Sequence, residues 1–332
     1  MVNRVLSDMF KNDLLDGVLK LLRKRVMDDN TLMLAIREGY ISIYYRGGNI
    51  LKLSETKKAH TYKTGFDKKY ASGSSLSLPG SPGQIASEAE VREWLGSFPK
   101  QIASEADLQE WIGSFPVRKQ IMDCWFTKHP KMEREFQQLV ARENTCSSIS
   151  NETEYFITDV EMADTKLGAR FDMLAFKWTY AERKTDNVRL ALIEMKYADD
   201  ALDGACGITA HLKQFNEFLQ KTAACGELRR MAARQINQLN ELGLISHSRP
   251  DRRSFTVKKE DKFEVVFLFA NHNPRSPKLL SELESVEFSS LAAEMGEFCD
   301  IRFFIANSSG YAMHEACMAE LDDYRRFLRS MR

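Results

Sequence analysis

Two carboxylates and one lysine lie in neighbouring apolar segments near the middle of the chain. Asp172 stands near the start of the first segment. Glu194 and Lys196 end the second segment, with Met195 between them. Charged side chains are seldom placed in apolar runs without a task. Two carboxylates beside a lysine suit the binding of a hard divalent cation and of a phosphodiester.

The sequence around these residues predicts two β-strands joined by a hairpin. The apolar runs 171–178 and 190–197 flank the polar sequence AERKTDN, which is suited to a turn. Side chains alternate across a strand, so Glu194 and Lys196 share one face. Asp172 reaches the same face if the two strands pair. The three side chains are therefore expected to form one site.

This arrangement resembles the PD-(D/E)xK nuclease superfamily, over residues 131–220. Phe171 stands where the proline of the signature would be. The resemblance implies a restriction-endonuclease-like fold, which is an α/β fold with a mixed β-sheet flanked by helices. It also implies metal-dependent hydrolysis of phosphodiester bonds, with Mg²⁺ or Mn²⁺ as cofactor. The implied partner is nucleic acid, with DNA favoured over RNA.

The resemblance also assigns the metal ligands. Asp172 and Glu194 would bind the cation, together with an acid from the helix that precedes the sheet. Glu135 is the candidate for that acid, and Glu133 and Glu143 compete with it. A solvated helix face explains these helical acids equally well.

A second set of residues would act on the attacking water. Lys196 and Gln214 would orient this water, and Lys196 would also neutralise the developing charge. The spacing of Gln214 and Phe218 resembles the Q-x-x-x-Y element that follows the lysine in many members of the superfamily. His211 lies one turn earlier and could act in the same way, although a lone helical histidine is more often structural. The expected catalytic residues are therefore Asp172, Glu194, Lys196 and Gln214.

Basic residues gather after the predicted site. Residues 227–262 contain nine basic and five acidic side chains, in a chain with 47 of each and no net charge. Phosphate backbone is bound through lysine and arginine, so this segment is the expected nucleic-acid surface. The residues expected to bind nucleic acid are Arg229, Arg230, Arg252 and Arg253. Basic residues distributed over the protein surface without a binding role would give the same composition.

The chain divides by pattern into two regions. Residues 131–332 are expected to form the nuclease-like domain, in which Asp159 on an early strand faces solvent or the rim of the cleft. Residues 1–130 are expected to form an α+β region. Its predicted parts are a helix over 5–26, a β-meander over 32–55, a flexible linker over 71–83 and a tandem duplication over 84–119.

The duplication contains two short helical copies, QIASEAEVREWLGSFP and QIASEADLQEWIGSFP. In each copy a serine, Ser87 or Ser104, is followed three residues later by an acid, which predicts a capped helix start. A docking surface built from Trp94 and Trp111 would be a functional interpretation. A peripheral duplicated loop is the simpler one.

Composition limits the other classes of function. The six cysteines lack a C-x-x-C pair, so neither a zinc site nor a disulfide framework is indicated. No apolar run has the length of a membrane span, and the start of the chain lacks a signal core, so a cytoplasmic protein without a membrane partner is expected. A homodimer is compatible with the sequence.

Two other functions compete with the nuclease. The first is an inactive nuclease-like scaffold that binds proteins or nucleic acid. The second is a different α/β enzyme, for which no phosphate-binding glycine loop or nucleophile elbow is found.

Overall fold

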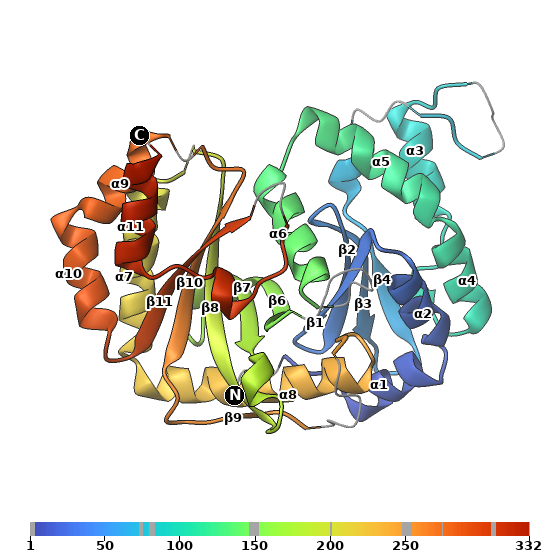
Figure 1. The fold of residues 1–332 in the computed structure, drawn as a ribbon. Coiled ribbons are helices and arrows are strands. Elements are labelled where there is room, and N and C mark those ends of the chain that lie inside the picture. Colours follow the sequence, from blue (N-terminus) through green and yellow to red (C-terminus); the bar gives the residue numbers. More distant parts are fainter. Residues whose placement is uncertain are drawn as a thin grey trace. The chain divides into compact units, whose positions relative to one another are not determined.

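The computed structural model describes residues 4–72, 76–79, 84–145, 153–199, 201–247, 254–273, 275–306 and 310–331. The chain is a mixed α/β protein with two sheets, and the general α/β class predicted from sequence is confirmed (Figure 1). It divides into an N-terminal unit that ends at residue 138 and a C-terminal unit that begins at residue 139. The sequence pattern placed this boundary at residue 130.

The N-terminal unit is built on an antiparallel sheet in the order β1-β2-β3-β4-β5. The meander predicted over residues 32–55 is confirmed as the first three strands. On β3 the exposed Lys52 lies between the buried Leu51 and Leu53, as expected for a sheet with one covered face. The strands are β1 (Leu32–Arg37), β2 (Tyr40–Tyr45), β3 (Gly48–Glu55), β4 (Tyr62–Gly65) and β5 (Gln101–Ile102).

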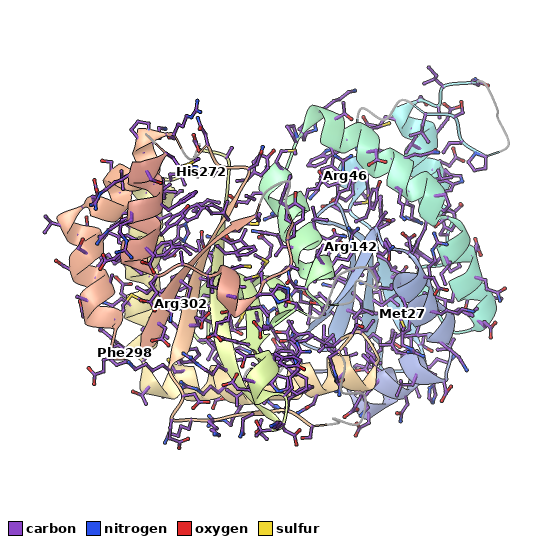
Figure 2. The ribbon with its side chains drawn as sticks, in the orientation of Figure 1. Met27, Arg46, Arg142, His272, Phe298 and Arg302 are labelled. Atoms are coloured by element: carbon purple, nitrogen blue, oxygen red, sulfur yellow. The ribbon has the colours of Figure 1, made fainter. Side chains whose placement is uncertain are left out.

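The turn between β2 and β3 has the conformation favoured in two-residue hairpins. Arg46 and Gly47 both have positive φ, at 51° and 70°. This pair of values fits the right-handed twist of the two strands, and it is why a glycine stands at the second position. This turn joins β2 and β3 at Arg46, which is labelled in Figure 2. It also directs the Arg46 side chain towards Asp123 and Glu135, to which it forms ion pairs.

The predicted helix over residues 5–26 is wrong in one respect, because the structure has two helices there. The chain turns at Gly17, where an added Cβ would lie within 2.2 Å of the Asp13 carboxylate. Asp13 is buried, and its carboxylate accepts hydrogen bonds from the Tyr62 hydroxyl and from His60. This fixed carboxylate and the adjacent glycine end the first helix. The two helices are α1 (Asp8–Leu15) and α2 (Lys20–Asp28).

Four further helices complete this part of the chain. The duplicated copies form the first two, and both predicted helix starts are confirmed as capping boxes at Ser87 and Ser104. Two longer helices follow the duplication, and the second contains Glu135. They are α3 (Glu88–Gly96), α4 (Glu105–Gly113), α5 (Phe115–Lys128) and α6 (Met132–Glu143).

The C-terminal unit is built on a mixed sheet in the order β11-β10-β8-β7-β6. The short strand β9 pairs in parallel with the first two residues of β8. The first three strands in the chain form an antiparallel meander, and the last two long strands run parallel to β8. The hairpin that was predicted to carry the acids is confirmed. The strands are β6 (Tyr155–Asp164), β7 (Ala169–Lys177), β8 (Asn187–Tyr197), β9 (Thr256–Val257), β10 (Phe263–Ala270) and β11 (Cys299–Ala306).

Helices cover one face of this sheet with an aromatic layer. Phe215 of α7 packs on Phe267 of β10, and Phe288 of α10 packs on both Phe267 and Phe303. Tyr324 of α11 stacks on Phe303. These rings bury large apolar areas and fix the helices to the strands. The helices are α7 (Ile208–Leu219), α8 (Thr222–Glu241), α9 (Pro277–Glu284), α10 (Val286–Met295) and α11 (Leu321–Ser330), and α10 was not predicted.

The expectation that Asp159 faces solvent is wrong. The register of β6 shifts between Ile157 and Asp159, which breaks the alternation of side chains. Asp159 is fully buried, and its carboxylate accepts hydrogen bonds from the Val160 amide and the Gln235 side chain. No helix in the described part of the chain has the length and apolar character needed to cross a membrane.

Candidate active site

The predicted site lies where the pairing of β7 and β8 ends. The last paired residues are Met173 and Ile193. Beyond them, the Asp172 carboxylate accepts a hydrogen bond of 2.8 Å from the Met195 amide. The side chain therefore takes the place of a backbone acceptor in the ladder. Because Met195 stands between Glu194 and Lys196, this bond places the Asp172 carboxylate at the backbone between these two residues.

Glu194 and Lys196 form a buried pair. Only 3% of Glu194 and 4% of Lys196 is exposed, and the Lys196 Nζ atom lies 2.7 Å from Glu194 Oε1. The Nε2 atom of His211 lies 3.0 Å from the same oxygen. Buried charges are costly unless they are paired and hydrogen bonded, which both partners provide here.

The register of the sheet explains why a residue of α7 reaches this pair. Glu194 lies opposite Phe267 of β10, and Lys196 lies opposite Phe269. Residues that are opposite each other in neighbouring strands project to the same face. Since Phe267 contacts Phe215 of α7, Glu194 and Lys196 project towards α7 as well. His211 lies one turn before Phe215 on that helix.

The environment of His211 disfavours its charged form. Burial lowers its pKa to about 4, and the positive charges of Lys196 and Arg170 contribute in the same direction, while a hydrogen bond to the Cys206 backbone raises it. An ionised carboxylate only accepts hydrogen bonds, so Nε2–H of His211 donates to Glu194 Oε1. The histidine thereby orients the Glu194 carboxylate.

Arg170 was not identified from sequence as a site residue. It lies on β7 two residues before Asp172, and it is exposed. Its charge acts on His211, which places it on the approach to the buried pair. Its spacing could have identified it, because residues two apart on a strand share a face, and Arg170 stands two residues before Asp172.

Gln214 and Glu135 were also predicted for this site, but neither contacts Asp172, Glu194 or Lys196 in the hydrogen bonds and ion pairs described here. Gln214 is exposed on α7, one turn beyond His211. Glu135 belongs to the N-terminal unit, where Arg46 donates hydrogen bonds to both of its carboxylate oxygens, at 2.9 and 3.0 Å. Its role as a metal ligand finds no support in these contacts.

The donor set of the site consists of two carboxylates. No group of three or more histidine, cysteine, aspartate or glutamate side chains that could hold a metal is found among the described residues. Magnesium is commonly held by one or two carboxylates, with water and substrate phosphate completing its shell. The carboxylates of Asp172 and Glu194 have the chemistry of such ligands.

Two of the four residues predicted to bind nucleic acid belong to the described part of the chain. Arg252 and Arg253 lie outside the described residues. Arg229 is half-buried, donates a hydrogen bond to the Asp261 carbonyl and packs over the Phe263 ring. Arg230 is exposed, forms an ion pair with Glu227 and lines an open depression of about 950 Å³.

That depression has a basic rim, which we call the basic depression. Besides Arg230, it contains Lys166 from the turn between β6 and β7, Lys221 at the start of α8, and Lys259. Glu227 is the one acidic residue that lines it in the described part of the unit. The sequence interval 227–262 could not reveal this set, because two of the lysines lie outside it.

Comparisons with family models, curated proteins and solved structures found no match to this chain. The fold and the site therefore rest on the contacts described above.

Proposed function

We propose that this protein is a metal-dependent nuclease with a restriction-endonuclease-like core, and that Asp172, Glu194 and Lys196 form its active site. The observation that carries the proposal is the hydrogen bond from the Met195 amide to Asp172. It brings a second carboxylate to a buried Glu-x-Lys at the end of a strand. A mixed sheet with an antiparallel meander and helices packed on it is compatible with this core.

Asp172 and Glu194 would hold Mg²⁺ or Mn²⁺, which supplies a polarised water and an electrophile for the phosphate oxygens. Lys196 provides a fixed positive charge next to these carboxylates. A cation placed where negative charge develops stabilises the transition state of phosphodiester hydrolysis. His211 orients Glu194 through its Nε2–H group. Gln214 lies on the exposed side of α7 and is left with the role of contacting substrate.

Nucleic acid would approach through the basic residues of the same unit. Arg170 is exposed beside the site, and the basic depression begins at the turn before β7. Gly168 precedes Asp172 by four residues, which corresponds to about 13 Å along a strand. A nucleic-acid strand of a few nucleotides spans that distance. The basic residues would position the backbone without reading sequence.

The decisive experiment measures cleavage and metal binding in the same variants. Asp172→Asn, Glu194→Gln and Lys196→Met would be compared with the wild type on supercoiled plasmid, single-stranded DNA and RNA, with Mg²⁺ or Mn²⁺. Glu217→Gln and Lys213→Gln are matched controls, because both residues are exposed on α7. Asp172→Asn retains an acceptor for the Met195 amide and removes only the charge, so loss of activity would not be a loss of fold.

We expect cleavage by the wild type and by both controls, and a fall of at least about 100-fold in each site variant. Calorimetry should detect metal binding in the wild type and in Lys196→Met, but not in the variants that lack a carboxylate. Metal binding without cleavage of any of the substrates would favour the scaffold function instead. Cleavage that survives in Glu194→Gln would refute the proposed site.

A further inference from the structure

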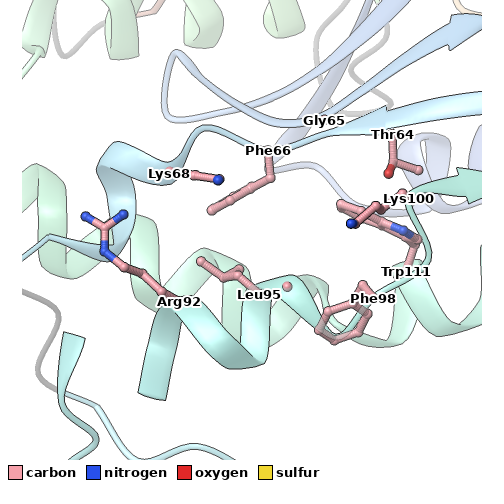
Figure 3. Close-up of a pocket in the computed structure, with 10 residues that line it drawn as sticks. Thr64, Gly65, Phe66, Lys68, Arg92, Leu95, Phe98, Lys100 and Trp111 are labelled. Carbon is pink, nitrogen blue, oxygen red and sulfur yellow. The ribbon is translucent and has the colours of Figure 1, made fainter. Parts of the chain in front are cut away.

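A pocket of about 340 Å³ lies in the N-terminal unit, away from the residues used above. Figure 3 shows that Phe66, Phe98 and Trp111 present their rings to it. Both copies of the duplicated segment contribute to its wall, with Phe98 from the first copy and Trp111 from the second. Small-molecule sites typically begin at roughly this volume and are lined by aromatic side chains with a few polar groups.

The aromatic wall is held from behind by a buried arginine. Arg118 of α5 is fully buried, and its guanidinium lies 3.9 Å from the centre of the Trp111 ring. It also lies 4.7 Å from the ring centre of Phe98 and 4.9 Å from that of Phe66. Cations are attracted to the faces of such rings. The guanidinium donates to the Ser114 hydroxyl through Nε, at 2.7 Å.

The two terminal nitrogens of Arg118 have no hydrogen-bond partner in the described part of the chain. A buried charge without an anionic partner is costly, and burial lowers the pKa of this side chain. No acidic side chain lines the pocket among the described residues. The rings that line the pocket therefore have a fixed positive charge behind them, which favours an anion in front.

Further cations stand at the rim. Lys68 and Arg92 lie at one end of the pocket, and Lys100 lies beside Trp111 at the other (Figure 3). Arg92 is paired with Glu88, whereas Lys68 and Lys100 form no ion pair with any described residue. The walls thus offer flat rings next to several positive charges. A ligand that satisfies both features carries a flat ring and an anionic group.

We propose that this pocket binds a small anion with a flat ring, of the chemical class of a nucleoside monophosphate. The ring stacks on Phe66 and Phe98, which are half-exposed in the pocket wall, as bases stack on aromatic side chains in proteins that bind single strands. The phosphate lies between Lys68 and Arg92, where ammonium and guanidinium groups can form charge-assisted hydrogen bonds. Both copies of the duplication contribute to this wall, because Phe98 comes from the first copy and the buried Trp111 that packs against it comes from the second.

The test is calorimetric titration of the full chain, without metal and in the presence of chelator. The probes are the four 5′-nucleoside monophosphates, the matching nucleosides and ribose 5-phosphate. We expect at least one monophosphate to bind with a Kd below about 1 mM. Its nucleoside and ribose 5-phosphate should each bind at least about tenfold more weakly, since each lacks one of the two recognition elements. Equal binding of ribose 5-phosphate, or no binding by any monophosphate, overturns the proposal.

Two variants separate the ring from the charge. Phe98→Leu keeps apolar volume but removes the ring, and Arg92→Gln removes charge at the rim. Each should weaken binding by about tenfold or more, and Lys58→Gln, an exposed lysine that does not line the pocket, should not change it. Wild-type affinity in both variants overturns the assignment of the ligand to this pocket.

A third variant makes the result independent of the proposed nuclease. Asp172→Asn alters only the catalytic site, so it should bind the nucleotide as the wild type does. Loss of binding in that variant would place the nucleotide in the catalytic site and would also refute the pocket proposal.

Discussion

Removal of Lys196 should destabilise the C-terminal unit and should make its stability depend on Mg²⁺. In Lys196→Met the Glu194 carboxylate stays buried, with 3% exposure, after losing an ammonium partner at 2.7 Å. Breaking a buried ion pair on one side costs about 3–5 kcal/mol. His211 still donates a hydrogen bond to this carboxylate, so the cost should lie at the lower end, about 3 kcal/mol.

A divalent cation should recover much of this loss, because it neutralises the carboxylate that Lys196 left unpaired. A ligand at 100 times its Kd stabilises the folded state by about 2.7 kcal/mol. The double variant Glu194→Gln/Lys196→Met should lose less stability than Lys196→Met and should not respond to Mg²⁺, since the carboxylate is gone.

The same sheet provides a matched control. Lys177 of β7 and Glu264 of β10 form a second buried ion pair, at 2.9 Å. Lys177→Met should lose a similar stability, but Mg²⁺ should not recover it. Native-state hydrogen exchange of the amides of β8 and β10 measures the C-terminal unit without interference from the other unit. A loss below about 1 kcal/mol in Lys196→Met, or equal recovery in Lys177→Met, would refute the reasoning.

Three other outcomes follow from the contacts. The pKa of His211 is about 4 in the folded chain against about 6.5 when unfolded, so stability should fall by up to roughly 3 kcal/mol as the pH drops from about 6.5 to 4, and less in His211→Gln; chemical denaturation at each pH measures this. Trp111→Ala should cost about 3–5 kcal/mol of unfolding free energy, because Trp111 is buried, and Trp94→Ala, at the half-buried equivalent position, should cost clearly less in thermal and chemical unfolding. Neutralising Lys166, Lys221 and Lys259 should weaken DNA binding on all sequences and lower the slope of log K against log salt by about 3, whereas Lys278→Gln, a control on α9, should leave it unchanged.

Local patterns predicted most elements of the fold. The apolar runs around Asp172 and Glu194 are long and lie on either side of a polar turn, so the hairpin was evident. The serine and acid of each duplicated copy identified both helix starts, because a capping box is encoded within four residues. Such features depend on neighbours in sequence, and this is why they were predictable.

The features that local patterns did not reveal are set by distant contacts. Asp159 is buried because a bulge in β6 shifts the alternation by one residue, and a regular period of two cannot anticipate a bulge. Glu135 was predicted as a metal ligand, and the structure gives its carboxylate an ionic partner, Arg46, that lies 89 residues away in the chain. The spacing of acids on a helix contains no information about such a partner.

The two copies of the duplication show the same limit in another form. Their sequences are nearly identical, yet Phe115 of the second copy is fully buried and Phe98 of the first is half-exposed beside the pocket. The second copy begins with β5, which pairs with β4, and the matching residues of the first copy are not in a strand. Burial in these copies is decided by what packs against them, so nearly identical sequences differ in how deeply their equivalent residues are buried.

The two buried lysine–glutamate pairs of the C-terminal sheet indicate which feature marks a candidate active site. Glu264 is fully buried, and its carboxylate is engaged by both Lys177 and the Tyr155 hydroxyl. Lys177 has a second carboxylate partner in Glu315, so this cluster satisfies its own charges. Burial and ion pairing alone therefore do not distinguish a site from a structural cluster.

The pair of Glu194 and Lys196 differs in its surroundings rather than in its own geometry. Next to it stand a half-buried carboxylate, Asp172, and an exposed cation, Arg170, both on the strand edge beyond the last paired residues. The Lys177 cluster also reaches the surface, through Glu315, whose side chain is 54% exposed, but both of its acids are paired with Lys177. Asp172 instead accepts its hydrogen bond from the backbone between Glu194 and Lys196. This second carboxylate next to a buried Glu-x-Lys, rather than burial or ion pairing, is the reason to assign chemistry to Glu194 and Lys196.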